Sequence, residues 1–230
     1  MTATSAAGTL AMQAGGEELL LLPEKAVWWP GGRTLLVADL HLGKAATFRA
    51  HGVPVPRGTT GATLAALDAL LERWPQARRI VCLGDFLHAP EAHAPATLAA
   101  LARWRARHAE ISMTLVRGNH DDRAGDPPAT LAIEIVDEPL RAGGLALCHH
   151  PRAVAGAYTL AGHLHPCVTL GGRAHDRLRL PCFHFGPEVG VLPAFGSFTG
   201  MHPIRRAPGD RVVVVADGGL AALPALPGGR

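Results

Sequence analysis

Several features that would assign a protein to a specialised class are absent from this sequence. No apolar run is long enough to cross a membrane, and residues 1–16 lack the basic start and apolar core of a secretory signal. We therefore expect a cytoplasmic protein with no membrane partner. Aromatic residues are few, with one Tyr and six Phe, and the net charge of +3 comes without a dense basic stripe. Both observations weaken the case for a nucleic-acid substrate, because there is no evident basic groove or aromatic stacking series for single strands.

Cysteine is also sparse and forms no CxxC pair. The four cysteines are widely spaced, and Cys82 and Cys148 lie inside apolar runs typical of strands. We expect buried, reduced thiols and no disulfide framework. The spacing also excludes a zinc finger, which a chain of 230 residues does not need for stability.

The composition indicates a globular protein with a large core, because 48% of the residues are hydrophobic and 18% are charged. Motifs spread from Asp39 to His165 favour a single domain. We expect that domain to span residues 17–220, between a flexible N-terminus or marginal edge strand at 1–16 and a flexible tail at 221–230.

The order of predicted elements changes halfway along the chain. Up to residue 116, strand-like runs alternate with helical patterns at 59–74 and 95–108, and a short helix or turn occupies 43–50. From residue 133 onward, short strands separated by Gly, Pro and charged turns predominate. This order predicts an α/β fold in which parallel βαβ units are followed by a β-rich half, forming two stacked sheets with helices outside.

Five of the strand-like runs end in polar residues that can bind metal ions. The runs finish near residues 39, 83, 116, 148 and 161, and small or charged residues follow each of them. The polar residues at these ends are Asp39 and His41, Asp85, Asn119 with His120 and Asp121, His149 or His150, and His163 with His165. We expect the fold to bring the five ends together.

The types of side chain point to a transition metal. Carboxylates, imidazoles and one amide oxygen suit Mn²⁺, Fe²⁺ or Zn²⁺, whereas an all-oxygen set would suit Mg²⁺ or Ca²⁺. There are too many candidate ligands for one tetrahedral ion, so two divalent ions sharing a carboxylate are expected. In an extended chain, alternate side chains share a face, which would let Asp39 and His41 hold one ion together.

Longer motifs resemble a known family. The sequence reads ADLHLGKA at 38–45, FRAHGVPVPRGTT at 48–60, GHLHP at 162–166 and LPAFGSFTG at 192–200. Together with the ordered polar ends, these motifs resemble the calcineurin-like metallophosphoesterase superfamily, and within it the bacterial ligase-associated members. The resemblance implies a four-layer αββα sandwich of two mixed sheets, a dinuclear metal site, and a functional association with a DNA ligase and a helicase in DNA repair.

The resemblance also implies a role for each residue. The first metal would be bound by Asp39, His41, Asp85 and His165, and the second by Asp85, Asn119, His149 and His163. His149 is preferred to His150 because it comes first after its strand. His120 would be the general acid for the leaving oxygen, and Asp121 would orient the His120 ring.

Several cationic residues follow the first ligand pair, and one interpretation is that they form a basic lip, a positively charged rim that binds the rest of the substrate. These are Lys44, Arg49, His51 and Arg57, for which ordinary surface positions are an equal alternative. His88 could support the site, although an ordinary loop histidine is the simpler interpretation.

The predicted function is a Mn²⁺-dependent phosphodiesterase acting on nucleic acid such as DNA, or on a nucleotide-like diester. The main alternative is a hydrolase of a small phosphoester or pyrophosphate, such as a cyclic nucleotide. A non-catalytic scaffold is a further alternative, although such proteins usually lose ligands and every candidate ligand is present here. The oligomeric state is left open.

Overall fold

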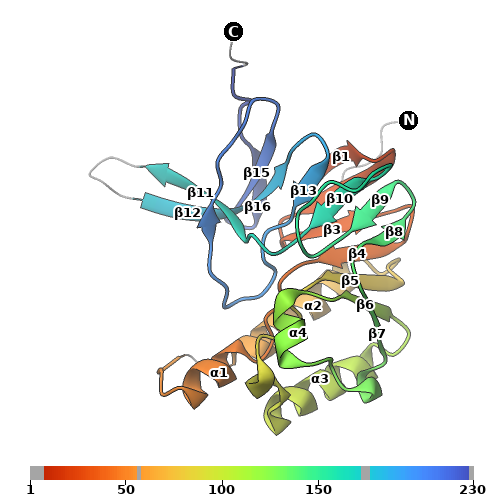
Figure 1. Cartoon of the computed structure of the whole chain (residues 1–230), viewed down its shortest axis with the longest axis vertical. Helices are drawn as coiled ribbons and strands as arrows, with labels where there is room; N and C mark the ends of the chain where they lie inside the picture. Colours follow the sequence, from red (N-terminus) through yellow and green to blue (C-terminus); the bar gives the residue numbers. More distant parts are fainter. Residues whose placement is uncertain (1–7, 56–57, 172–176, 228–230) are drawn as a thin grey trace.

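The first half of the chain forms a mixed seven-stranded sheet. The computed structural model describes residues 8–55, 58–171 and 177–227 (Figure 1). The strands lie in chain order, with β1 to β4 antiparallel and β4 to β7 parallel. Their bounds are β1 Leu10–Ala14, β2 Glu17–Leu22, β3 Ala26–Trp29, β4 Thr34–Val37, β5 Arg79–Leu83, β6 Ser112–Val116 and β7 Ile133–Val136.

Helices cover one face of this sheet. They are α1 Lys44–Ala50, α2 Thr59–Arg73, α3 Pro95–Arg107 and α4 Asn119–Ala124, with short 3₁₀ turns at Pro90–His93 and Ala129–Leu131. Helix α2 buries Leu64, Leu67 and Leu71, which lie on one side because they are spaced by three or four residues. Trp74 stacks on Trp28 of β3, with ring centroids 5.4 Å apart. This apolar layer fixes the helices on the sheet.

The second half forms a mixed sheet of nine strands. Its main order is β14-β11-β12-β13-β10-β9-β8, and β15 pairs with β12 and β16. The strands are β8 Leu140–Ala142, β9 Leu145–Leu147, β10 Tyr158–Ala161, β11 Pro166–Gly171, β12 Arg177–Phe185, β13 Val189–Val191, β14 His202–Pro203, β15 Arg211–Ala216 and β16 Gly219–Ala222.

The two sheets pack against each other through a buried apolar layer. Leu36 and Val81 of the first sheet lie in one cluster with Leu147, Leu160 and Phe183 of the second, and all five are essentially inaccessible to solvent. Burial of this kind contributes roughly 25 cal/mol per Å² of apolar surface. The layer therefore holds the ends of strands from the two sheets at a fixed separation.

The predicted α/β architecture, with two mixed sheets and flanking helices, is confirmed, but the outer helical layer over the second sheet is not. In the described part of the chain, all α-helices precede β7 and lie on the side of the first sheet (Figure 1). Within the described residues, the connections after β7 consist of turns and irregular segments. Partly buried Ile204 and Leu223 instead cover Cys182 and Val214 of the second sheet.

Two predicted boundaries also move. Residues 10–14 form β1, paired along its length with β2, where a flexible segment or marginal edge strand was expected. Strand β16 ends at Ala222, just inside the predicted tail. The four cysteines are buried and free, as predicted. Within the described residues, no helix is long and apolar enough to span a membrane.

Candidate metal centre

The predicted ligands meet at one edge of the two-sheet core. Asp39 and His41 follow β4, Asp85 follows β5, and Asn119 begins α4 just after β6. Because β4, β5 and β6 are parallel, their carboxyl ends lie side by side. The second sheet adds His149, His163 and His165, which follow strands β9 and β10.

Five of these residues have an unusual backbone conformation. Asp39, His41, Asp85, His163 and His165 all have positive φ, between 46° and 71°. This left-handed region is uncommon for residues with a Cβ and carries strain that clusters at functional sites. The expectation that Asp39 and His41 lie on an extended strand is therefore wrong, because β4 ends at Val37. Their side chains converge through tight turns instead.

Glycine makes room for this convergence. Gly84 has φ of 77°, and a Cβ there would lie 2.1 Å from Nδ1 of His149. A Cβ on Gly162 would lie 2.8 Å from an Asp39 carboxylate oxygen. The Gly-Asp and Gly-His pairs of the sequence thus reflect close packing between ligands.

One group of ligands comprises Asp39, His41 and His165. Nε2 of His41 lies 3.2 Å from Nε2 of His165, which is 3.6 Å from Oδ1 of Asp39. Nδ1 of His165 lies 3.2 Å from the Gly200 carbonyl oxygen. Donation of the Nδ1–H to that carbonyl leaves a lone pair on Nε2, directed at the other two ligands.

The second group surrounds His149. Its Nδ1 lies 3.1 Å from the Leu83 carbonyl, so this nitrogen is the donor and Nε2 carries the lone pair. Nε2 faces Oδ1 of Asn119 at 3.0 Å, Nδ1 of His163 at 3.0 Å and Oδ1 of Asp85 at 3.4 Å. Lone pairs that converge in this way repel one another unless a cation lies between them.

Asp85 stands between the two groups. Its Oδ2 is 3.7 Å from Nε2 of His41, whereas its Oδ1 faces His149. Burial, reinforced by neighbouring cationic groups, drives the pKa of His41 far below its usual value, and burial also lowers the pKa of His163. Both imidazoles are thus neutral, which is the form that binds metals. The residues present fit two divalent ions sharing one carboxylate.

His149 and His150 have different environments. The His149 side chain is fully buried, whereas 46% of the His150 side chain is exposed and its Nδ1 lies 3.1 Å from Oε1 of Glu138. Glu138 also accepts the backbone N–H groups of His149 and His150, at 2.7 and 2.9 Å. These contacts favour His149 as the ligand. No motif in the sequence pointed to Glu138, which lies eleven residues before His149.

His120 is oriented by a different residue from the one predicted. Its Nδ1 donates to the His88 carbonyl at 2.6 Å, and its ring stacks on the His88 ring. Nε2 lies 4.0 Å from Oδ2 of Asp85 and so faces the site. His88 also places its Nδ1 3.1 Å from Nδ1 of His41. His88 is therefore part of the site, and its position three residues after Asp85 was the available signal.

Asp121 does not touch the His120 ring. It is fully buried, and its Oδ1 accepts the N–H groups of Phe86 and Leu87 while its Oδ2 accepts that of Gly118. The predicted role of Asp121 as the group that orients His120 is wrong. Asp121 instead joins the turn after β5 to the turn after β6, and thereby places Asp85 beside Asn119.

The predicted basic lip is only partly assembled. Lys44 lines the same hollow of about 230 Å³ as His41, Asp85 and His120, and burial lowers its pKa. Arg49 lines a separate hollow between α1 and α2. His51 is exposed at the end of α1, and Arg57 lies outside the described residues.

The fold and the clustered ligands define a class of protein. Residues 32–194 match the model of the calcineurin-like phosphoesterase family, and the chain belongs to that family. It is accordingly a metal-dependent phosphoester hydrolase. The ends of its parallel strands carry the candidate carboxylate and amide ligands together with His41, and the second sheet carries the other candidate imidazoles.

Among solved structures, the chain is similar to Pseudomonas putida nuclease MPE. The two are 46% identical with a TM-score of 0.83, over 94% of this chain and 100% of the nuclease. A protein of unknown function from Aquifex aeolicus is more distant, at 18% identity and a TM-score of 0.40 over 57% of this chain and 78% of the other. No curated protein is significantly similar to the chain.

Proposed function

We propose that this protein is a Mn²⁺-dependent phosphodiesterase with a dinuclear centre, acting as a nuclease. The observation that carries the proposal is the position of Asp85 between two sets of imidazoles and acidic or amide oxygens. The similarity to a nuclease over nearly the whole chain supports a nucleic-acid substrate. Mixed nitrogen and oxygen donors suit Mn²⁺, with Fe or Zn as alternatives.

Two bound ions would supply an activated water and neutralise negative charge on the phosphate. The protein's own contribution begins with His120. Because its Nδ1–H is held by the His88 carbonyl, a protonated ring presents Nε2–H to the hollow above Asp85. That proton can pass to the leaving oxygen. Lys44 adds positive charge at the rim of the same hollow.

Further parts of the proposal rest on sequence resemblance. Similarity to the ligase-associated metallophosphoesterase PdeM supports a role in DNA repair and a functional association with a DNA ligase and a helicase. The cytoplasmic location is likewise a prediction. The scaffold alternative has little support, because His120 lines the same hollow as five of the candidate ligands, which are His41, Asp85, Asn119, His163 and His165.

The test is cleavage of end-labelled single-stranded DNA with Mn²⁺ by the wild type and by His120→Ala. We expect the variant to retain its metal ions and to lose about 10²–10⁴-fold in turnover of DNA. The loss should be smaller on bis(p-nitrophenyl) phosphate, whose leaving group needs no proton. His108→Ala, at the end of α3, is the control histidine.

The outcomes separate the candidate functions. Equal DNA cleavage by wild type and His120→Ala would remove His120 from the mechanism or reveal a contaminating nuclease. Turnover of the aryl diester without any DNA cleavage would support the small-phosphoester alternative. Absence of bound metal after reconstitution with Mn²⁺ would contradict the dinuclear centre itself.

A further inference from the structure

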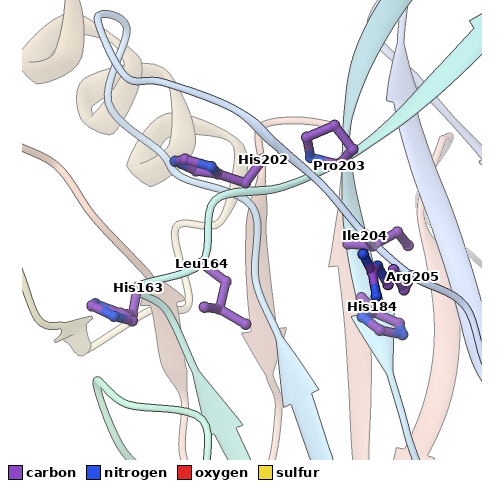
Figure 2. Close-up of a pocket in the computed structure, with 7 residues that line it drawn as sticks. All are labelled: His163, Leu164, His184, His202, Pro203, Ile204 and Arg205. Carbon is purple, nitrogen blue, oxygen red and sulfur yellow. The ribbon is translucent and has the colours of Figure 1, made fainter.

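A second cavity adjoins the metal centre. It has a volume of about 570 Å³ and lies between the turn after β10, the strand β14 with the loop that follows it, and β12. Figure 2 shows His163 and Leu164 on one side of this cavity, and His184, Ile204 and Arg205 on the other. None of the roles assigned above to the metal centre uses His184, Ile204 or Arg205.

The cavity borders the hollow above the metal centre, because His163 and His202 line both. A phosphodiester placed at the metal centre must extend in two directions, because both of its ester oxygens carry substituents. A substituent that extends past His163 would reach the second cavity.

The lining has an apolar part and a cationic end. Leu164, Pro203 and Ile204 provide the apolar surface, and Leu164 is 45% exposed although its side chain is large. Arg205 is exposed at the far end, next to His184. The His184 ring is held by Asp210, with 2.7 Å between Nε2 and Oδ2. An apolar surface ending in a fixed imidazole and a guanidinium is suited to a flat base followed by a phosphate.

We propose that this cavity is a nucleotide subsite, which binds the base and the next phosphate of an unpaired nucleotide beside the scissile bond. The proposal rests on the proposed nuclease function and adds a substrate preference to it. A base that is stacked and paired in a duplex cannot enter a side cavity, whereas an unpaired base can. Apolar contact from Leu164 and Ile204 would hold the base, and Arg205 would pair with the phosphate.

The main test is Arg205→Ala, with Arg103→Ala as the matched control because Arg103 is an exposed arginine on α3, remote from the cavity. Binding of fluorescein-labelled oligothymidylate is measured by anisotropy against salt, in the His120→Ala background so that the strand stays intact. Loss of one phosphate contact should reduce the slope of log K against log[salt] by about 0.7. Arg103→Ala should leave the slope unchanged.

A second measurement tests the contact with the base. The His120→Ala protein should bind oligothymidylate about tenfold more tightly than an abasic strand of equal length, as expected for a base contact of modest strength. Leu164→Ala should reduce the ratio between the affinities for oligothymidylate and for the abasic strand. Equal affinity for the two strands, or an unaltered salt slope in Arg205→Ala, would overturn the subsite.

Failure of the subsite can be distinguished from failure of the nuclease function. In cleavage assays, the loss caused by Arg205→Ala should be about tenfold greater on oligothymidylate than on bis(p-nitrophenyl) phosphate. DNA cleavage with equal losses on both substrates would refute the subsite and leave the nuclease function standing. Turnover of the aryl diester without DNA cleavage would refute both.

Discussion

Asp121 offers a sharp test of how the metal centre is supported. Its carboxylate accepts three backbone N–H groups, from Phe86, Leu87 and Gly118, each at 3.0 Å, and its side chain is fully buried. Burial raises the pKa of Asp121 to about 6, against the three N–H donors that favour the ionised form. At pH 8 the group is therefore ionised and acts only as an acceptor.

Asp121→Asn keeps the shape of the side chain and replaces one acceptor oxygen with an NH₂ donor. The remaining oxygen can serve Phe86 and Leu87, and the NH₂ then faces the N–H of Gly118. Loss of a charge-assisted hydrogen bond costs about 1.5–3 kcal/mol, and buried donors left without an acceptor add about 1–3 kcal/mol. The raised pKa shows that the buried charge itself costs free energy at pH 8, and Asp121→Asn relieves that cost. We therefore expect a net loss of about 1 kcal/mol in the free energy of unfolding and, for a chain of this size, a fall of about 2–4 °C in the melting temperature.

Urea unfolding at pH 8 and metal content measure the two consequences. Because the N–H of Gly118, directly before Asn119, loses its acceptor, the turn that positions Asn119 should loosen, and Asp121→Asn should also bind the metal ions more weakly. Asp122→Asn is the matched control, since Asp122 is the next residue of α4 and its side chain is 66% exposed. If Asp121→Asn lost turnover while its unfolding free energy and metal content matched those of the wild type, Asp121 would act directly on catalysis and this reasoning would be refuted.

Two further predictions concern the histidine pair and a buried lysine. His149→Ala should lose one of the two metal ions, whereas His150→Ala should retain both, because only His149 faces Asn119 and Asp85. The metal content of the two purified variants tests this prediction. The reverse pattern would make His150 the ligand. Burial lowers the pKa of Lys25 to about 8 in the folded protein. Between about pH 8 and pH 10 the unfolded chain therefore binds more protons than the folded chain, and the free energy of unfolding should rise with pH. Urea unfolding should show that Lys25 contributes about 2 kcal/mol to this rise between about pH 7.5 and 9.5, and Lys25→Met should remove it; identical pH profiles for the two proteins would contradict a lowered pKa.

The identity of the candidate ligands could be predicted because their signal is local. An apolar run followed by Gly and a ligand-type side chain marks the end of a strand, and parallel strands bring such ends together. The same logic correctly placed Asp85 near Asn119, although 34 residues separate them in the chain. This reasoning did not predict the left-handed turns. Contacts between elements impose that backbone strain, and the spacing of Asp39 and His41 in the sequence does not reveal it.

The supporting residues could not be predicted, for the same physical reason. Glu138 and Asp121 act through backbone N–H groups, and any residue type can supply an N–H. The sequence around an acceptor of this kind therefore carries no pattern. The helical layer over the second sheet was implied by the family resemblance and agreed with the expectation of helices outside two stacked sheets, whereas the Gly- and Pro-rich connections of the second half favoured strands.

The metal centre depends on how the two sheets are held together. Asp39 and Asp85 come from the first sheet, and His149 and His163 from the second. Contacts between the sheets act directly on these ligands: the His163 N–H donates to both oxygens of Asp39, at 3.1 and 3.0 Å, and Nδ1 of His149 donates to the carbonyl of Leu83.

Strain at the ligands must be offset by this packing. A residue held at positive φ costs on the order of 1–3 kcal/mol, and five ligands share that conformation. The apolar layer between the sheets, which includes Leu36 and Leu160, is fully buried and supplies the opposing free energy. The ligands are thus held in place by the core, so the geometry of the centre is set by the fold and does not have to be created by the bound ions.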